Sequence, residues 1–122
     1  MEGSLTVITI LPADKAFLQS VAAPDGVDAM VLRDGDGSVF GHALFRLNGD
    51  RVEVLSVYTD LPVMAEGLVR AVLNAGDCRG ATEGFCADES LAPLLLRLEF
   101  APVEGGYAVS LAQFFRGECH CK

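Results

Sequence analysis

The chain has 122 residues, of which 51% are hydrophobic, with a mean hydropathy of +0.36 and a net charge of −8. This length and composition indicate one globular domain with a well-filled core, and they exclude a disordered chain. The excess of negative charge repels nucleic acids and anionic membranes, so we expect neither of them as a partner.

The first half of the sequence predicts a strand, a short helix and an antiparallel meander. Asp14 is a suitable N-cap for the short helix, since its carboxylate can accept from the first helical amides. The turns at residues 34–37 and 48–50 contain the Asp-Gly and Asn-Gly pairs that tight hairpins prefer. The expected elements are a strand at 5–10, a helix at 15–23, and strands at 28–33, 38–47 and 52–58.

The most informative segment is a strand–helix–strand unit that begins with the strand at 52–58. Apolar residues recur at helical spacing over residues 64–79, which predicts an amphipathic helix, and Gly80 ends it. A further strand is expected at 81–86. A helix that crosses between two strands at this spacing predicts a βαβ unit with neighbouring parallel strands.

The last third of the sequence predicts one more helix and one more strand. Asp88 or Ser90 can cap a helix at 91–98, with Pro93 in its first turn, where a missing N–H costs nothing. We expect Pro102 to end this region and a final strand to span 107–111.

The order of these elements resembles the GNAT superfamily of acetyl-CoA-dependent N-acyltransferases. Four segments carry the resemblance: 53–57, 67–73, 92–100 and 106–109. It implies an α/β fold with a mixed central sheet flanked by helices. It also implies a single domain over residues 1–116, followed by a flexible tail at 117–122.

The resemblance also implies a reaction, in which an acetyl group moves from acetyl-CoA to an amine of a small molecule or protein. In this family the acyl arm lies beside the fourth strand, and the pyrophosphate lies at the start of the following helix. The residues of this chain that match those positions are Leu55, Ser56, Val57, Ala65, Glu66, Gly67 and Leu68.

Several positions depart from the family pattern. The loop before the long helix lacks most of the glycines that let a backbone approach phosphate. Pro62 offers no N–H there, and Asp60 and Glu66 place negative charge beside it. Leu95 stands where many family members have a tyrosine acid, and Glu99 stands where they have a glycine.

Two residues are candidates for proton transfer. Glu53 matches the strand position where several family members keep a general base, and its apolar neighbours predict a raised pKa. The alternative is an ion pair with Arg46 or Arg51 across the hairpin. Tyr58 could replace the missing acid, as could Tyr107, although both suit ordinary half-buried strand positions.

Histidine and cysteine residues suggest other sites. His42 could act as a base or serve a structural role. Cys119, His120 and Cys121 form a compact cluster of soft ligands, but a metal needs three or four ligands in fixed geometry, so we expect no metal site. Oxidisable thiols are the simpler interpretation of this cluster.

The sequence leaves two functions open. The first is a GNAT-type acetyltransferase. The alternative is a catalytically degenerate GNAT-fold module that binds a partner or another ligand, or forms a homodimer through an open sheet edge. No long apolar run or basic leader is present, so we expect a cytoplasmic protein whose four cysteines are mostly reduced.

Overall fold

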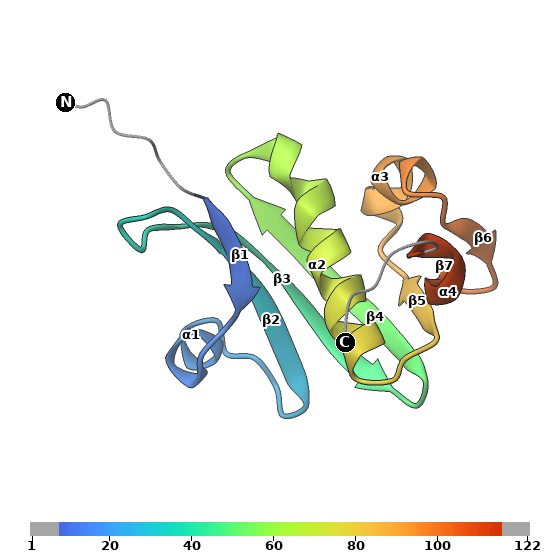
Figure 1. Ribbon diagram of the computed structural model, residues 1–122, viewed down its shortest axis with the longest axis horizontal. Coiled ribbons are helices and arrows are strands. Elements are labelled where there is room, and N and C mark those ends of the chain that lie inside the picture. The colour runs from blue at the N-terminus through green and yellow to red at the C-terminus, as the bar shows by residue number, and fades with distance from the viewer. Residues whose placement is uncertain (1–7, 116–122) are drawn as a thin grey trace.

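The computed structural model describes residues 8–115, which form a seven-stranded sheet flanked by helices (Figure 1). The strands are β1 (Thr9–Pro12), β2 (Val27–Arg33), β3 (Val39–Asn48), β4 (Arg51–Thr59), β5 (Glu83–Cys86), β6 (Ala101–Val103) and β7 (Gly106–Ser110). The α-helices are α1 (Lys15–Ser20), α2 (Ala65–Cys78), α3 (Ala92–Arg97) and α4 (Leu111–Phe114). Two 3₁₀ turns, Pro62–Met64 and Glu89–Leu91, precede α2 and α3. This architecture confirms the predicted α/β class with a mixed central sheet.

The sheet has the strand order β1-β2-β3-β4-β5-β7-β6. Strands β1 to β4 form an antiparallel meander, as the predicted hairpin turns require. Strands β4 and β5 pair in parallel, with Arg51 opposite Glu83 and Val54 opposite Cys86. A parallel pair needs a crossover connection, which α2 provides. The predicted βαβ unit is therefore confirmed, and β7 and β6 extend the sheet in antiparallel fashion.

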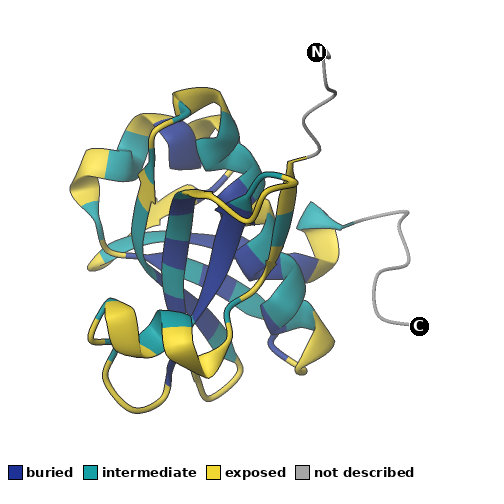
Figure 2. Ribbon diagram, turned by 90° about the vertical axis from the view of Figure 1, so that its left-hand side faces the viewer, coloured by how far each residue is buried: buried dark blue, intermediate teal, exposed yellow. Residues whose placement is uncertain are grey.

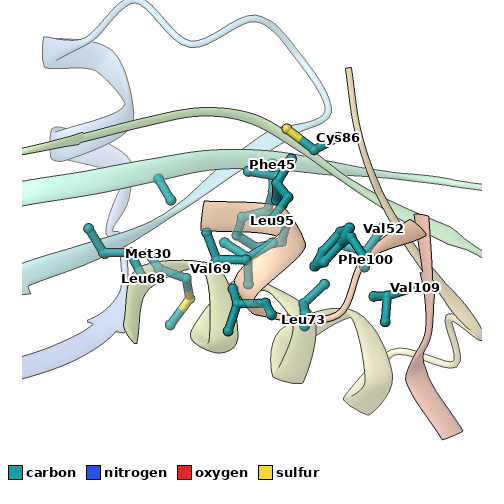
Figure 3. Packing of buried hydrophobic residues seen from close by; sticks show 14 of the residues in the cluster. Met30, Phe45, Val52, Leu68, Val69, Leu73, Cys86, Leu95, Phe100 and Val109 are labelled. Atoms are coloured by element: carbon teal, nitrogen blue, oxygen red, sulfur yellow. The ribbon is translucent and has the colours of Figure 1, made fainter. Parts of the chain in front are cut away.

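Helix α2 covers one face of the sheet because its apolar residues form one stripe. Its fully buried side chains are Leu68, Val69, Val72 and Leu73. Gly76 lets the helix approach the sheet closely, since an added Cβ would lie 2.5 Å from Cβ of Val52. Leu95 of α3 lies in the same core as the buried residues of α2 (Figure 3). Leu111 of α4 also belongs to this core, so α2, α3 and α4 share this face.

Helix α1 packs against the opposite face. Successive strand residues point to opposite sides, so Ala43 of β3 enters the α2 core whereas His42 faces α1. The rings of His42 and Phe17 are in edge-to-face contact, with centroids 5.4 Å apart. Asp14 caps α1 as predicted and accepts from the Phe17 N–H at 2.8 Å. Buried residues concentrate in the strands and on the inner sides of the helices (Figure 2).

Several boundaries differ from the sequence predictions. Helix α1 ends at Ser20 rather than residue 23, because Ala22 adopts a positive φ of 54° that a helix cannot contain. Strand β1 continues to Pro12, at the edge of the sheet. The role expected of Pro102 is wrong, since it lies in the unpredicted strand β6. Strand β6 lies at the other edge of the sheet, where a proline without an N–H need not interrupt the hydrogen bonds between strands.

Within the described residues, no helix is long and apolar enough to span a bilayer. Cys86 is a free thiol in the core, and burial raises its pKa. Cys78 is disulfide-bonded, so the expectation of a reduced thiol is wrong at this position. The expected tail, with Cys119, His120 and Cys121, lies outside the described residues.

Candidate active site at the end of strand β4

Strand β4 loses its neighbour β5 halfway along its length. The parallel pairing ends where Val54 lies opposite Cys86, but β4 continues to Thr59 and stays paired with β3. The backbone groups on the β5 side of residues 55–59 therefore have no ladder partner among the described strands. Three of the predicted donor-binding residues lie on this divergent part of the strand: Leu55, Ser56 and Val57.

A β-bulge lies at the point where the two strands separate. Phe45 of β3 is opposite Val54, and the next residue, Leu44, is opposite Ser56, so Leu55 is an extra residue in β4. A bulge bends its strand and redirects the groups that follow, and bulges are common beside active sites. The sequence contains no signal for it, because the extra residue is defined by pairing with β3.

The turn after β4 is fastened to β3 by hydrogen bonds. The Asp60 N–H donates to the Phe40 carbonyl at 2.8 Å. The Thr59 hydroxyl lies 3.2 Å from the same carbonyl oxygen and accepts from the Leu61 N–H at 2.9 Å. The position of Asp60 at the end of the strand is therefore fixed by contacts on both sides of it.

Four main-chain donors around the turn before α2 are already engaged. The Met64 N–H donates to the Leu61 carbonyl at 2.8 Å, and the Ala65 N–H donates to the Pro62 carbonyl. The N–H groups of Asp60 and Leu61 are engaged in the turn, and Pro62 has none. The helix dipole favours an anion here, but these four amides are committed to acceptors of the protein itself.

The predicted cofactor residues of α2 have different environments. The Glu66 carboxylate lies 3.1 Å from Nε of Arg70 and 3.7 Å from Nε of Arg97. Leu68 is fully buried, so only its main chain could contact a ligand. Gly67 lies close to the Ile10 side chain, which an added Cβ would approach to 3.2 Å.

The predicted raised pKa of Glu53 is wrong. A hydrogen bond from Nε of Arg46 at 2.8 Å lowers the pKa of the Glu53 carboxyl and outweighs the opposing effect of burial. Asn48 also donates to this carboxylate at 3.3 Å. The ion pair with Arg46 is therefore the alternative that the structure confirms, whereas Arg51 pairs with Glu83 at 2.9 Å.

Tyr58 lies on the α1 side of the sheet, next to His42. The two residues are paired across β3 and β4, and their ring centroids are 6.0 Å apart. The Tyr58 hydroxyl donates to Oδ1 of Asp60 at 2.6 Å, and this hydrogen bond raises the Tyr58 pKa. Burial lowers the pKa of His42, which favours the uncharged form of its imidazole.

The other candidate phenol lies elsewhere. The Tyr107 hydroxyl donates to Glu89 at 2.8 Å, which raises the pKa of Tyr107. Leu95 is fully buried and contributes only to the core. Sequence reasoning missed the pairing of Tyr58 with Asp60, although an aromatic residue followed two positions later by a carboxylate at a strand end was a detectable signal.

Comparison with known proteins gives matches of structure but not of sequence. No protein-family model matches the chain, and no curated protein is similar in sequence. Spermidine N-acetyltransferase of Vibrio cholerae, solved as a dodecamer, has 10% identity and a TM-score of 0.66, with 89% of this chain and 96% of that chain covered.

Two other solved structures give similar values. A GNAT-family acetyltransferase of Staphylococcus aureus has 10% identity and a TM-score of 0.64, with 86% and 99% of the two chains covered. A protein of E. coli classed as an N-acetyl transferase and solved with coenzyme A has 16% identity and a TM-score of 0.63, with 84% and 98% covered. The chain therefore has the fold of the GNAT acetyltransferases.

Proposed function

We propose that this protein is an N-acetyltransferase that moves an acetyl group from acetyl-CoA to an amine of a small molecule or protein. The observation that carries the proposal is the separation of β4 from β5 beyond Val54. It leaves strand backbone free next to the start of α2, where the acetyltransferases of this fold have their donor site. The likeness to a structure solved with coenzyme A supports the same assignment.

The free edge of β4 suits the pantetheine arm of an acyl-CoA. That arm is extended and contains two amides, so it can pair with strand backbone as an added strand does. Leu55, Ser56 and Val57 supply the backbone groups in this proposal. The bulge at Leu55 redirects an amide that could polarise the thioester carbonyl.

The reaction requires an uncharged amine nitrogen to attack the thioester carbonyl carbon. A C–N bond forms and the C–S bond breaks; the nitrogen loses its proton to solvent water, and the sulfur gains one from a protein acid that solvent reprotonates. Tyr58 is the proposed proton donor to the sulfur, because a phenol carries its proton at neutral pH and Tyr58 lies on β4 beyond the point where β5 ends. Glu53 does not fit the part of the base, since Arg46 holds its carboxylate ionised in an ion pair.

The phosphate end of the donor fits less well than the pantetheine end. The loop amides are largely engaged, and Asp60 and Glu66 add negative charge. Arg70 and Arg97 bring positive charge near this helix start, but both lie beside the Glu66 carboxylate. We therefore expect most of the affinity for acetyl-CoA to come from the pantetheine arm.

Calorimetry with three ligands tests the proposal. Acetyl-CoA and S-acetylpantetheine should both bind, with dissociation constants that differ by less than about ten-fold, equivalent to about 1.4 kcal/mol. ADP, which carries the pyrophosphate without the arm, should bind far more weakly than either. Backbone amide signals of residues 55–59 should shift in NMR spectra when S-acetylpantetheine is added.

Two outcomes would contradict the proposal. No binding of acetyl-CoA at 1 mM concentration, on the order of the weakest useful affinity, would favour the alternative of a catalytically degenerate module. Binding that shifts amide signals only outside β4 and the start of α2 would place the donor at a different site.

A further inference from the structure

Cys78 is disulfide-bonded, and the rest of the chain leaves few partners for it. The sequence has four cysteines, at positions 78, 86, 119 and 121. Cys86 is a free thiol that is fully buried in the core. Within one chain the partner of Cys78 is therefore Cys119 or Cys121, so the bond joins the C-terminal end of α2 to the segment 116–122.

Cys78 lies on a ridge of α2 that also contains Arg70 and Asn74. The three residues are four positions apart, and side chains at this spacing lie one above the other on a helix. At the other end of the ridge, the Arg70 guanidinium lies over the Phe114 ring, 5.1 Å from its centroid. Phe114 ends α4, the last helix before the segment 116–122. The described chain therefore ends beside one end of the ridge, and the disulfide lies at the other.

The segment is long enough to connect the two ends of the ridge. The helix rises about 12 Å over the eight residues from Arg70 to Cys78. An extended chain reaches about 13–14 Å over the four residues from Phe115 to Cys119, and about 20–22 Å over the six residues to Cys121. A disulfide adds about 5.5–6 Å between Cα atoms. Either cysteine can therefore meet Cys78 from the end of α4.

Asn74, midway along the ridge, has an unsatisfied polar atom. Its Oδ1 is buried and accepts no hydrogen bond from the described residues. A buried acceptor without a donor is destabilising, and a main chain that crosses the ridge carries N–H donors. The segment 116–122 is the part of the chain whose two attachments, at Arg70 and at Cys78, lie on either side of Asn74.

We propose that a disulfide of Cys78 with Cys119 or Cys121 fastens residues 116–122 along this ridge of α2, and that reduction releases them. Forming the S–S bond from two thiols removes two electrons and two protons, which a small-molecule disulfide such as oxidised glutathione accepts as it is cleaved to two thiols. Cys78 is exposed, so such reagents can reach it from solution. This redox-sensitive clamp takes the place of the flexible tail expected from the sequence, and it does not depend on the acetyltransferase assignment.

Disulfide mapping identifies the bond. Protein equilibrated with oxidised glutathione and then freed of it is alkylated with N-ethylmaleimide in denaturant and digested with trypsin, which cleaves after arginine and lysine. Peptide 71–79, with Cys78, should be joined to peptide 117–122, with both tail cysteines, and dithiothreitol should separate the two. Alkylation or glutathionylation of Cys78, a bond between Cys119 and Cys121, or a disulfide-linked dimer would each refute the proposal.

Thermal unfolding followed by circular dichroism measures what the bond contributes. It closes a loop of about 40 residues, so the oxidised protein should melt about 10 °C above the protein reduced with tris(carboxyethyl)phosphine. This difference should vanish in Cys78→Ser and in the variant with serine at both tail cysteines. The single variant, Cys119→Ser or Cys121→Ser, that abolishes the difference identifies the partner.

Cys86→Ala is the matched control, since it removes a thiol outside the clamp. It should keep the difference in melting temperature between the oxidised and reduced protein, even if the loss of core packing lowers both values. A difference that persists in Cys78→Ser, or the absence of a difference in wild type, would refute the clamp.

NMR spectra test where the segment lies. On reduction, the side-chain amide signals of Asn74 should shift, because its Oδ1 loses the proposed donor. The main-chain amide of His42, on the opposite face of the sheet, is the control and should not shift. The same reductant should leave Asn74 unchanged in Cys78→Ser. If the bond is mapped but Asn74 does not respond to reduction, the segment does not lie along the ridge and that part of the proposal is overturned.

Discussion

Replacing Glu99 by glycine is expected to stabilise this protein. Helix α3 ends in a Schellman motif, in which the Glu99 N–H donates to the Leu96 carbonyl and the Phe100 N–H donates to the Leu95 carbonyl, both at 3.0 Å. The motif requires a left-handed residue at Glu99, whose φ is +71°. Glycine is strongly preferred there because a Cβ is strained in this conformation.

The expected gain follows from two opposing terms. A residue with a Cβ loses about 1–2 kcal/mol in the left-handed region. Glycine has greater conformational freedom in the unfolded chain, which lowers the free energy of unfolding by roughly 0.5–1 kcal/mol. The free energy of unfolding should therefore rise by roughly 0.5–1 kcal/mol, and the melting temperature by about 2–4 °C for a domain of this size.

The measurement is urea unfolding followed by far-UV circular dichroism, because the chain has no tryptophan for fluorescence. Glu99→Ala is the matched control, since it removes the same charge but keeps the strained Cβ. The glycine variant should exceed wild type and the alanine variant should not. Equal stability of the two variants would show that charge, and not backbone conformation, determines the effect, and would refute the reasoning.

Three further predictions concern the sheet and the candidate site. Gly41→Ala should lower the free energy of unfolding, measured in urea, by about 2 kcal/mol, because an added Cβ would lie 2.6 Å from a main-chain oxygen of β4. Gly35→Ala is the control and should leave this free energy unchanged, since its Cβ would meet nothing within 4 Å. Glu66→Gln should lower the dissociation constant of acetyl-CoA by about three-fold in calorimetry, since it removes a negative charge and frees Arg70 and Arg97 from their ion pairs. An unchanged dissociation constant would mean that the phosphates bind elsewhere. Glu53 has a lowered pKa, so its pair with Arg46 stabilises the protein above the unfolded pKa of about 4.3 and is lost as pH falls through the folded pKa. Glu53→Gln should therefore be less stable than wild type at pH 7, and this difference should disappear at acidic pH; a difference that is constant with pH would contradict the assignment.

The local sequence was sufficient to predict most of the elements. The Asn-Gly and Asp-Gly turns place β2, β3 and β4 in one antiparallel meander, because those residues accept the backbone angles of tight hairpins. The apolar stripe of α2 and the following Gly80, which has a φ of +95°, define the crossover helix. Each of these signals acts over a few neighbouring residues, so no knowledge of the rest of the fold is needed.

The candidate site depended on contacts between distant segments. The bulge at Leu55 exists only relative to β3, and the free edge of β4 exists only because β5 ends at Cys86. The sequence suggested a raised pKa for Glu53 from its apolar neighbours in the chain, but the cross-strand partner Arg46 reverses the direction.

The sequence by itself determined the α/β class and the parallel pair, since periodicity and turn chemistry are local properties. The tertiary structure decided which charges meet, which backbone groups remain free and which rings share a face. The cluster of His42, Tyr58 and Asp60 illustrates the difference, because its members come from two strands and a turn. Electrostatic interactions depend on distance in space and on burial, and both are set only when the chain is folded.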